Sequence, residues 1–155
     1  MTSVKIGVAG CAGRMGQMLL NEVRATAGAA LAGGTEQPGG TAIGKDLATL
    51  IGGTPTGAVV TDDPAALFAV ADVVIDFTAP AASVRHAQIA AKAGKAMVIG
   101  TTGLSADHQA ALAAAATAVP IVFAPNMSLG VNLLLALVEQ AAAKLGPGYD
   151  IEILE

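Results

Sequence analysis

The chain has 155 residues and a formal net charge of −4, and its length suits one domain with its own core. The acidic balance argues against a nucleic-acid partner, because neutralising phosphates requires a basic face. A single cysteine excludes an internal disulfide and fits a reducing cytoplasm, and we expect neither a secretory leader nor a membrane-spanning segment.

Segments typical of strands and of helices alternate along the sequence. The expected strands cover residues 4–9, 29–35, 58–61, 73–77, 96–99, 121–124 and 150–154. The expected helices cover residues 13–26, a segment from Pro64 behind the capping Asp63, 80–93, a segment from the capping Ser105 to about Ala118, and 131–145. This alternation predicts an α/β fold, a Rossmann-type doubly wound parallel sheet in three αβα layers. Aromatic residues are only 3%, so the core must consist of Val, Ile, Leu and closely packed Ala.

A glycine-rich segment, GCAGRMG at residues 10–16, follows the first strand directly. Glu36 stands 20 residues after Gly16, at the end of the second apolar run. In a dinucleotide-binding βαβ unit the glycines permit a tight turn, and the start of the helix faces the pyrophosphate. The acid accepts hydrogen bonds from ribose hydroxyls. The layout therefore predicts a dinucleotide-binding domain, and the family resemblance described below implies that this domain covers residues 1–148.

Three residues of the glycine segment need separate interpretation. Ala12 replaces the middle glycine of the usual motif, and its methyl group restricts the backbone and can push the pyrophosphate outward. Arg14 stands at the start of the helix, where we expect it to reach the pyrophosphate. We interpret Cys11 as a small residue that faces the strand rather than as a reactive thiol.

Glu36 is followed by Gln37 rather than by a basic residue. A carboxylate beside the ribose repels a 2′-phosphate, and no adjacent cation compensates for it, so the sequence favours NADH over NADPH. NADPH remains possible, since Lys45 could fold back and relax the preference.

Small, hydroxyl and amide residues follow three of the later strands. These stretches are Asp76-Phe77-Thr78, Gly100-Thr101-Thr102-Gly103 and Ala124-Pro125-Asn126-Met127-Ser128. Parallel strands present their carboxyl ends at one edge of the sheet, where ligands bind, so we expect these stretches to share that edge. The threonines suit either a nicotinamide site or a plain strand-to-helix turn. Asn126 suits a carboxamide contact or a turn cap, and Ser128 suits a helix N-cap.

The sequence contains no convincing proton donor. His86 and His108 lie on expected helices rather than at strand ends, and we expect neither to be catalytic. Asp76 ends a buried strand, where capping backbone groups is a better role for it than acting as a base. No spacing suggests a metal site, and no Ser-His-Asp arrangement appears.

Taken in order, these motifs resemble the dihydrodipicolinate reductase family, also called 4-hydroxy-tetrahydrodipicolinate reductase. The resemblance rests on GRMG at 13–16, DFT at 76–78, VIGTTG at 98–103, APNMSLGVN at 124–132 and the closing YDIEILE. It implies that the pyrophosphate is held by Gly10, Cys11, Ala12, Gly13, Arg14 and Met15. It implies that Glu36 holds the adenosine ribose. The nicotinamide pocket would be lined by Gly100, Thr101, Thr102, Ala124, Pro125, Asn126 and Met127, with Thr102 also touching substrate. Family members that use NADPH well often carry a basic residue at the position of Gln37, and some carry an arginine at that of Ala79.

The resemblance also implies a reaction and its limits. The family uses NAD(P)H to reduce 4-hydroxy-tetrahydrodipicolinate, a cyclic dicarboxylate, to tetrahydrodipicolinate in lysine and diaminopimelate biosynthesis, usually as a homotetramer. Residues 149–155 would begin the hinge into a substrate domain, and the family's histidine and lysine motif would lie beyond Glu155. We therefore expect no catalytic residue in these 155 residues and little or no turnover from them alone. The alternative is a stand-alone NAD(P)-binding or sensing module without catalysis.

Overall fold

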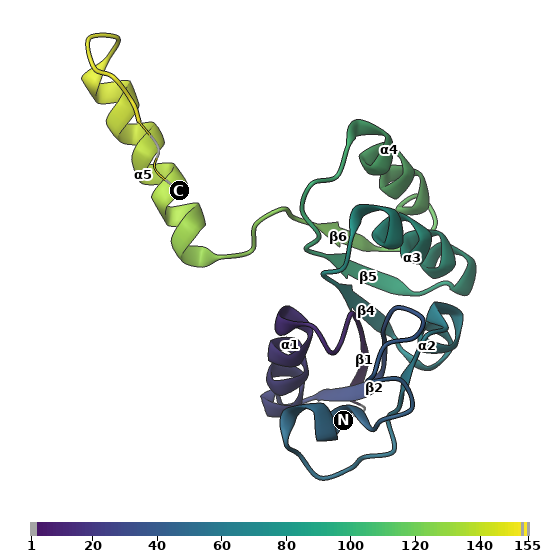
Figure 1. Cartoon of the computed structure of the whole chain (residues 1–155). Helices are drawn as coiled ribbons and strands as arrows, with labels where there is room; N and C mark the ends of the chain where they lie inside the picture. The colour runs from purple at the N-terminus through teal and green to yellow at the C-terminus, as the bar shows by residue number, and fades with distance from the viewer. Residues whose placement is uncertain (1–2, 153, 155) are drawn as a thin grey trace. The chain divides into compact units, whose positions relative to one another are not determined.

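A computed structural model describes residues 3–152 and residue 154. The chain divides into two units, Met1–Pro125 and Asn126–Glu155. In the described part of the first unit, six strands form one sheet in the order β3-β2-β1-β4-β5-β6, with every neighbouring pair parallel (Figure 1). The strands are β1 (Val4–Ala9), β2 (Ala29–Thr35), β3 (Val60–Thr61), β4 (Val73–Asp76), β5 (Ala96–Ile99) and β6 (Ile121–Phe123).

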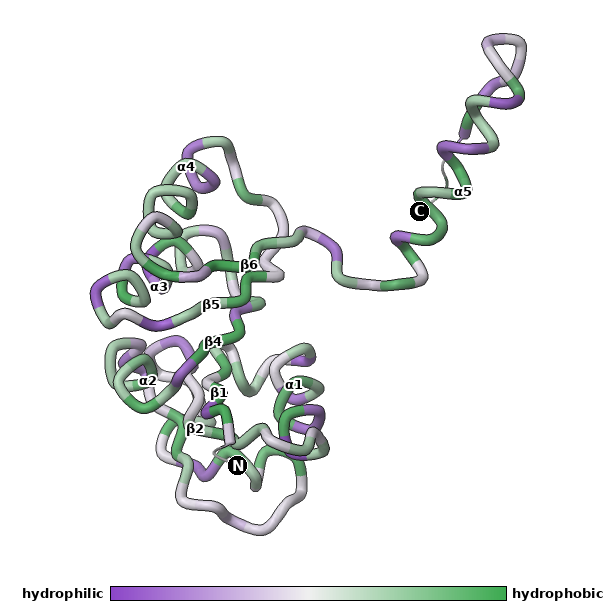
Figure 2. Tube along the Cα trace, turned by 180° about the vertical axis from the view of Figure 1, so that it is seen from behind, coloured by the Kyte–Doolittle hydropathy of each residue, from purple (hydrophilic) through white to green (hydrophobic). Residues whose placement is uncertain are grey.

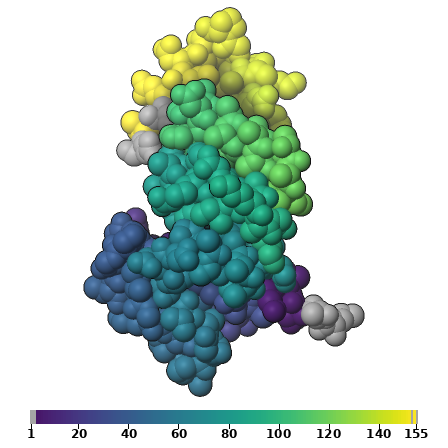
Figure 3. All heavy atoms as spheres, turned by 90° about the vertical axis from the view of Figure 1, so that its right-hand side faces the viewer, coloured from purple at the N-terminus to yellow at the C-terminus, as the bar shows by residue number. Residues whose placement is uncertain are grey.

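Helices cover both faces of this sheet. They are α1 (Arg14–Ala25), the 3-10 helix η1 (Leu47–Ile51), α2 (Pro64–Val70), α3 (Pro80–Ala93) and α4 (Ala106–Ala115). Figure 1 shows α1 on one side of the sheet and α2, α3 and α4 on the other. Figure 3 shows the outer surface of the second layer, where the teal and green segments of these helices pack side by side. The predicted Rossmann-type, three-layer fold is confirmed.

Among the described residues, two apolar clusters form the core, one on each face of the sheet. On the α1 side, Val8, Leu20, Leu47 and Val60 are buried. The larger cluster, on the other side, joins β4 and β5 to α2, α3 and α4; its buried members are Ala9, Leu67, Phe68, Ala71, Val74, Ala87, Ala90, Met97, Ile99, Leu112, Ala115 and Val119. Five of these twelve residues are alanines, as the near absence of aromatic residues predicted.

Local signals explain several helix boundaries. Asp63 caps α2 through a 2.9 Å hydrogen bond from the Ala65 N–H, with Pro64 as the first helical residue. Gly94 ends α3 in the left-handed conformation. Ser105 caps α4, although this helix ends at Ala115 rather than near residue 118.

One element was not expected, and one expected strand is wrong. The unexpected element is η1, which begins where the Asp46 carboxylate accepts a hydrogen bond from the Ala48 N–H. The strand expected at 150–154 is wrong for the described residues 150–152 and 154, because no strand there pairs with another among the described residues. Ile153 and Glu155, part of the expected hinge at 149–155, lie outside the described residues.

The second unit contains α5 (Leu129–Leu145). Figure 2 shows many hydrophobic residues along this helix. The Ser128 hydroxyl accepts a 3.3 Å hydrogen bond from the Val131 N–H, which confirms the N-cap interpretation, and α5 begins two residues earlier than predicted. No helix among the described residues is long and apolar enough to cross a membrane.

Candidate functional site

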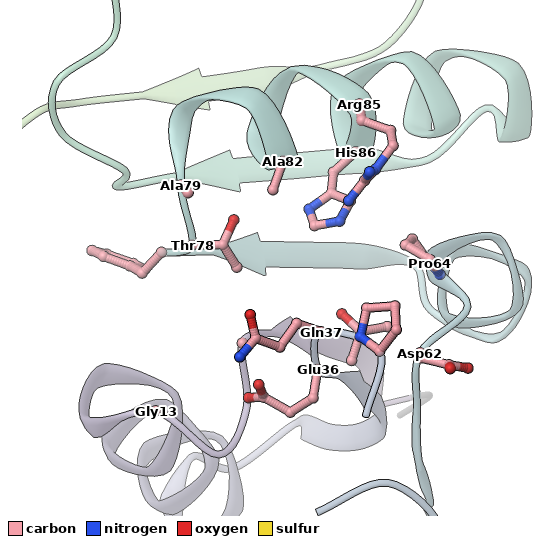
Figure 4. Close-up of a pocket in the computed structure, with 14 residues that line it drawn as sticks. Gly13, Glu36, Gln37, Asp62, Pro64, Thr78, Ala79, Ala82, Arg85 and His86 are labelled. Carbon is pink, nitrogen blue, oxygen red and sulfur yellow. The ribbon is translucent and has the colours of Figure 1, made fainter. Parts of the chain in front are cut away.

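A cavity of about 620 Å³ lies in the first unit, beyond the carboxyl ends of β1, β2 and β4. Its walls come from the loop after β1, the end of β2, the approach to α2, and the loop after β4 with α3 (Figure 4). The lining residues are Gly10, Gly13, Thr35, Glu36, Gln37, Pro38, Asp62, Pro64, Phe77, Thr78, Ala79, Ala82, Arg85 and His86. β1 lies between β2 and β4, so the cavity sits where the strand order reverses and ligands of such sheets bind.

The glycine loop after β1 is anchored on the end of β2. The Gly10 and Cys11 N–H groups both donate to the Thr35 carbonyl, at 2.8 and 3.1 Å. Gly10 has a φ of +70°, which only glycine adopts without strain. A Cβ added at Gly16 would collide with the Gly10 carbonyl, so α1 can pack against the loop only with glycine there. Among the described residues no other residue type has a positive φ, so Ala12 fits the loop without left-handed strain.

The N-terminus of α1 suits an anion. Its N-cap is Gly13, which offers no side-chain oxygen to the first N–H groups of the helix. The N–H groups of the first helical residues, Arg14 and Met15, have no partner within an α-helix and carry the positive end of its dipole. Loop and helix together therefore fit a pyrophosphate.

Glu36 lies at the edge of the cavity, directly after β2. Its Oε1 accepts a 2.7 Å hydrogen bond from the Ala12 N–H, so the acid is tied to the glycine loop. The second carboxylate oxygen remains for another donor, and a ribose hydroxyl has the matching chemistry. The residues present therefore fit the adenosine and pyrophosphate portions of a dinucleotide.

Cys11 is fully buried below this loop. Burial, and then the negative charge of Glu36, raises the pKa of its thiol to about 12. The thiol therefore stays protonated and unreactive at neutral pH, as the interpretation of a small structural residue predicted.

Asp76, the last residue of β4, is completely buried and holds four hydrogen bonds. Its Oδ1 accepts from the Thr78 N–H at 2.8 Å and the Thr78 hydroxyl at 2.6 Å, and more distantly from Thr101. Its Oδ2 lies 2.7 Å from the His86 Nδ1. Burial alone would raise the pKa of Asp76, but the hydrogen bonds from His86 and Thr78 outweigh it and hold the pKa below its ordinary value. The predicted capping role is confirmed.

Two residues of the GTTG stretch at 100–103 make contacts inside the protein. The Gly100 N–H donates to the Asp76 carbonyl at 2.9 Å, and the Phe77 ring lies where a Cβ of Gly100 would be. Thr101 is 4% exposed, and its hydroxyl accepts a 2.8 Å hydrogen bond from Ser83. Thr102, by contrast, is exposed. Thr101 thus turns its side chain inward and Thr102 leaves its own accessible.

The structure brings only part of the predicted site into one cavity. Gly10, Gly13 and Glu36 line it, whereas Arg14 and Met15 lie exposed on the first turn of α1. Gly100, Thr101 and Thr102 follow β5, and Ala124 and Pro125 follow β6, which pairs with β5. Asn126 and Met127 belong to the second unit, where the Asn126 Oδ1 accepts a 2.9 Å hydrogen bond from the Ser128 N–H as a turn cap. The nicotinamide role of these residues stays a prediction.

Most of the residues that line the cavity were not among the predicted site residues, and Asp62, Thr78, Arg85 and His86 are four of these. For His86 a signal existed. Ser83, His86, Ala87 and Ala90 are spaced as one buried face of α3, and a carboxylate at the end of a buried strand requires a donor. His108 instead forms a capping box with Ser105 on α4. Within the described part of the chain, no group of three or more His, Cys, Asp or Glu side chains could hold a metal ion.

Comparison with known sequences gives consistent matches. Residues 4–127 match the family described as dihydrodipicolinate reductase, N-terminus. The 4-hydroxy-tetrahydrodipicolinate reductase of Anaeromyxobacter dehalogenans (strain 2CP-1 / ATCC BAA-258) is 56% identical over 151 residues, which are 97% of this chain. The enzyme of the same name from Aromatoleum aromaticum is 50% identical over all 155 residues. The matched segment is 56% of the length of each relative, so the chain spans little more than half of these proteins.

Among solved structures, the chain is similar to a dipicolinate-bound dihydrodipicolinate reductase from Paenisporosarcina sp. TG-14, with a TM-score of 0.72 and 23% identity. The similarity covers 92% of this chain and 54% of that one, and at this identity it supports the fold alone. With a family match over residues 4–127 and relatives at 50–56% identity, the chain belongs to the dihydrodipicolinate reductase family, whose N-terminal nucleotide-binding domain it contains.

Proposed function

We propose that the chain binds NAD(P)H and supplies the cofactor-binding part of a 4-hydroxy-tetrahydrodipicolinate reductase. The observation that carries this proposal is that the glycine loop, the Gly13 N-cap of α1 and Glu36 line one and the same cavity. Loop N–H groups and the helix dipole hold the pyrophosphate, and Glu36 accepts from the adenosine ribose. When bound, the reduced nicotinamide supplies a hydride for the reduction.

The nicotinamide end is assigned to the loops after β5 and β6. Gly100, Thr101 and Thr102 together with Ala124, Pro125, Asn126 and Met127 would hold the ring. The inward hydrogen bonds of Thr101 fix the course of the first loop, so that the exposed Thr102 is the residue able to touch substrate. In this role the loops orient groups but do not supply a proton.

NADH is the preferred cofactor in this proposal. Glu36 places a carboxylate in the cavity, where it repels a 2′-phosphate, and Gln37 beside it brings no positive charge. Lys45 is exposed and is not among the described residues that line the cavity, whereas Arg85 on α3 lines it. Arg85 is therefore the cation through which some binding of NADPH persists.

The longer relatives are named 4-hydroxy-tetrahydrodipicolinate reductase, and the whole reaction is proposed on that ground. In it, reduction with loss of water would convert 4-hydroxy-tetrahydrodipicolinate to tetrahydrodipicolinate for lysine and diaminopimelate synthesis. The family resemblance further implies a homotetramer, and we propose that it works in the cytoplasm. Residues 149–155 would lead from the domain of residues 1–148 into the substrate domain. The 155-residue chain by itself would bind cofactor and turn over slowly or not at all.

A fusion tests this proposal. The chain is joined to the part of the Anaeromyxobacter dehalogenans relative that follows the matched 151 residues, and oxidation of NADH is followed with freshly generated substrate. We expect substrate-dependent oxidation by the fusion, little by the chain alone, and a strong reduction in a fusion carrying Glu36→Ala. A fusion that binds NADH tightly but never oxidises it would favour the alternative, a binding or sensing module without catalysis.

A further inference from the structure

His86 is a buried side chain whose two ring nitrogens have different surroundings. Its Nδ1 lies 2.7 Å from the Asp76 Oδ2, and the residue is 5% exposed. Asp76 is ionised, and a carboxylate accepts but does not donate, so the proton of this hydrogen bond belongs to Nδ1. In the neutral ring, Nε2 therefore carries a lone pair and can only accept.

Nε2 points away from Asp76 because the two nitrogens lie on opposite sides of the ring. His86 lines the cavity, and Figure 4 shows its ring directed from α3 into that space. Among the described residues no hydrogen bond reaches Nε2, and it is not one of the buried polar atoms without a partner. Nε2 is thus an acceptor open to the cavity, held in position by a completely buried carboxylate.

The ring lies in the part of the cavity that an adenine base would enter. Glu36 marks the ribose position, and the base extends from the ribose towards the remaining walls. These walls carry Pro38 and Pro64 on one side and the small Ala79 and Ala82 on the α3 side, which leaves room for a flat ring. The 6-amino group of adenine is a donor and so matches a neutral Nε2.

We propose that His86, fixed in its Nδ1–H tautomer by Asp76, accepts a hydrogen bond from the adenine 6-amino group and so selects adenine in the cofactor. This inference rests on the proposed function, since it assumes that the cavity takes the adenosine half of NAD(P)H. Asp62 also lines the cavity and can accept a hydrogen bond from the amino group. Its side chain is exposed, however, so a hydrogen bond to the base would replace one to water and add little binding free energy. A hydrogen bond in the sheltered position of His86 contributes more.

Reduced nicotinamide hypoxanthine dinucleotide is the matched probe, because a carbonyl oxygen replaces the 6-amino group and faces Nε2 with a second lone pair. The chain and its variants are titrated with NADH and with this analogue by calorimetry at a pH of about 8.5. The key variant is His86→Asn, whose amide N–H can still donate to Asp76 while Nε2 is removed. Gln88→Ala, exposed on the same helix, is the control.

We expect the unmodified chain to bind NADH about two- to tenfold more tightly than the analogue. His86→Asn should bind NADH more weakly by the same factor, so that it binds NADH and the analogue with equal affinity. Gln88→Ala and Asp62→Asn should keep the preference for NADH over the analogue. Equal binding of the two dinucleotides by the unmodified chain, or a difference that survives in His86→Asn, overturns the role of His86 while leaving cofactor binding intact. If the unmodified chain binds neither dinucleotide, the proposed function fails and this inference fails with it.

Discussion

The Ala12 N–H donates a 2.7 Å hydrogen bond to the Oε1 of Glu36, 24 residues further along the chain. This contact joins the loop after β1 to the end of β2 and fixes the acid beside the expected pyrophosphate. Among the described residues only Oε1 of the two carboxylate oxygens accepts a hydrogen bond, so the same residue can organise the loop and contact a ribose. Substitutions at Glu36 therefore separate the two roles.

Glu36→Gln should change cofactor selectivity more than stability. The glutamine carbonyl still accepts from Ala12, but the negative charge near the 2′ position is lost. We expect NADH affinity to fall about tenfold or less and the preference over NADPH to shrink. Calorimetric titrations with both cofactors measure this, with Glu22→Gln on the exposed face of α1 as the control. An unchanged NADH to NADPH ratio would contradict the electrostatic argument.

Gln37→Arg should strengthen binding of NADPH. The residue lines the cavity next to Glu36, and a guanidinium there can pair with a 2′-phosphate. We expect NADPH affinity to rise about tenfold with little change for NADH. Because phosphate pairing is screened, the gain should diminish in high salt. A gain that is equal for both cofactors would point to a general effect of charge rather than to the 2′-phosphate.

Gly16→Ala should destabilise the chain and impair cofactor binding. A Cβ at this position would collide with the Gly10 carbonyl, which belongs to the backbone and cannot move aside as a side chain can. We expect a loss of about 1–3 kcal/mol in the free energy of unfolding, measured by denaturant titration. Gly148→Ala is the matched control, since an added Cβ there meets nothing within 4 Å. Equal stability of the two variants would show that α1 does not pack against the loop as described.

Asp76 should make the free energy of unfolding depend on pH. The folded-state pKa lies below the ordinary value of about 3.9, so the carboxylate stabilises the fold above that pH, and the contribution is lost as the pH falls through the folded pKa. Asp76→Asn removes the charge that holds His86 and should cost about 3 kcal/mol at pH 7. Denaturant titrations at a series of pH values should show that the difference in the free energy of unfolding between the variant and the unmodified chain becomes smaller at acidic pH. A difference that does not change with pH would mean that the charge of Asp76 does not contribute to stability.

Cys11 should resist thiol reagents in the folded chain. Its burial and the raised pKa of about 12 leave almost no thiolate at pH 8. We expect modification by a disulfide reagent to be very slow in buffer and rapid in denaturant. Fast labelling of the native chain would show that the loop opens readily or that the thiol is not enclosed.

The sequence predicted the features that depend on local pattern. The continuous β-branched run that ends at Asp76 indicated a buried strand, and burial made a capping role for its carboxylate the better interpretation. Asp63-Pro64 and Gly94 set helix boundaries through backbone chemistry that neighbouring residues specify. The glycine loop and Glu36 follow a spacing imposed by the βαβ unit, so they could be placed without coordinates.

Features that depend on contacts between distant segments were missed. The spacing along α3 indicates that His86 lies on a buried face, but it does not say which residue of the sheet that face meets, so the contact with Asp76 was missed. The spacing of residues in the sequence also could not predict that Thr101 turns inward towards Ser83, 18 residues earlier. The strand expected at 150–154 is wrong for its described residues, 150–152 and 154, because a strand needs a neighbouring strand to accept its hydrogen bonds, and a sequence pattern does not supply one.

Cofactor binding by the unmodified 155-residue chain tests the central claim most directly. We would titrate the purified chain with NADH and, in parallel, with NADPH by calorimetry, after circular dichroism has shown that it is folded. The account predicts saturable binding of one cofactor per chain, with NADH bound more tightly than NADPH. A folded chain that binds neither cofactor would contradict the assignment of the cavity formed by the glycine loop, the start of α1 and Glu36.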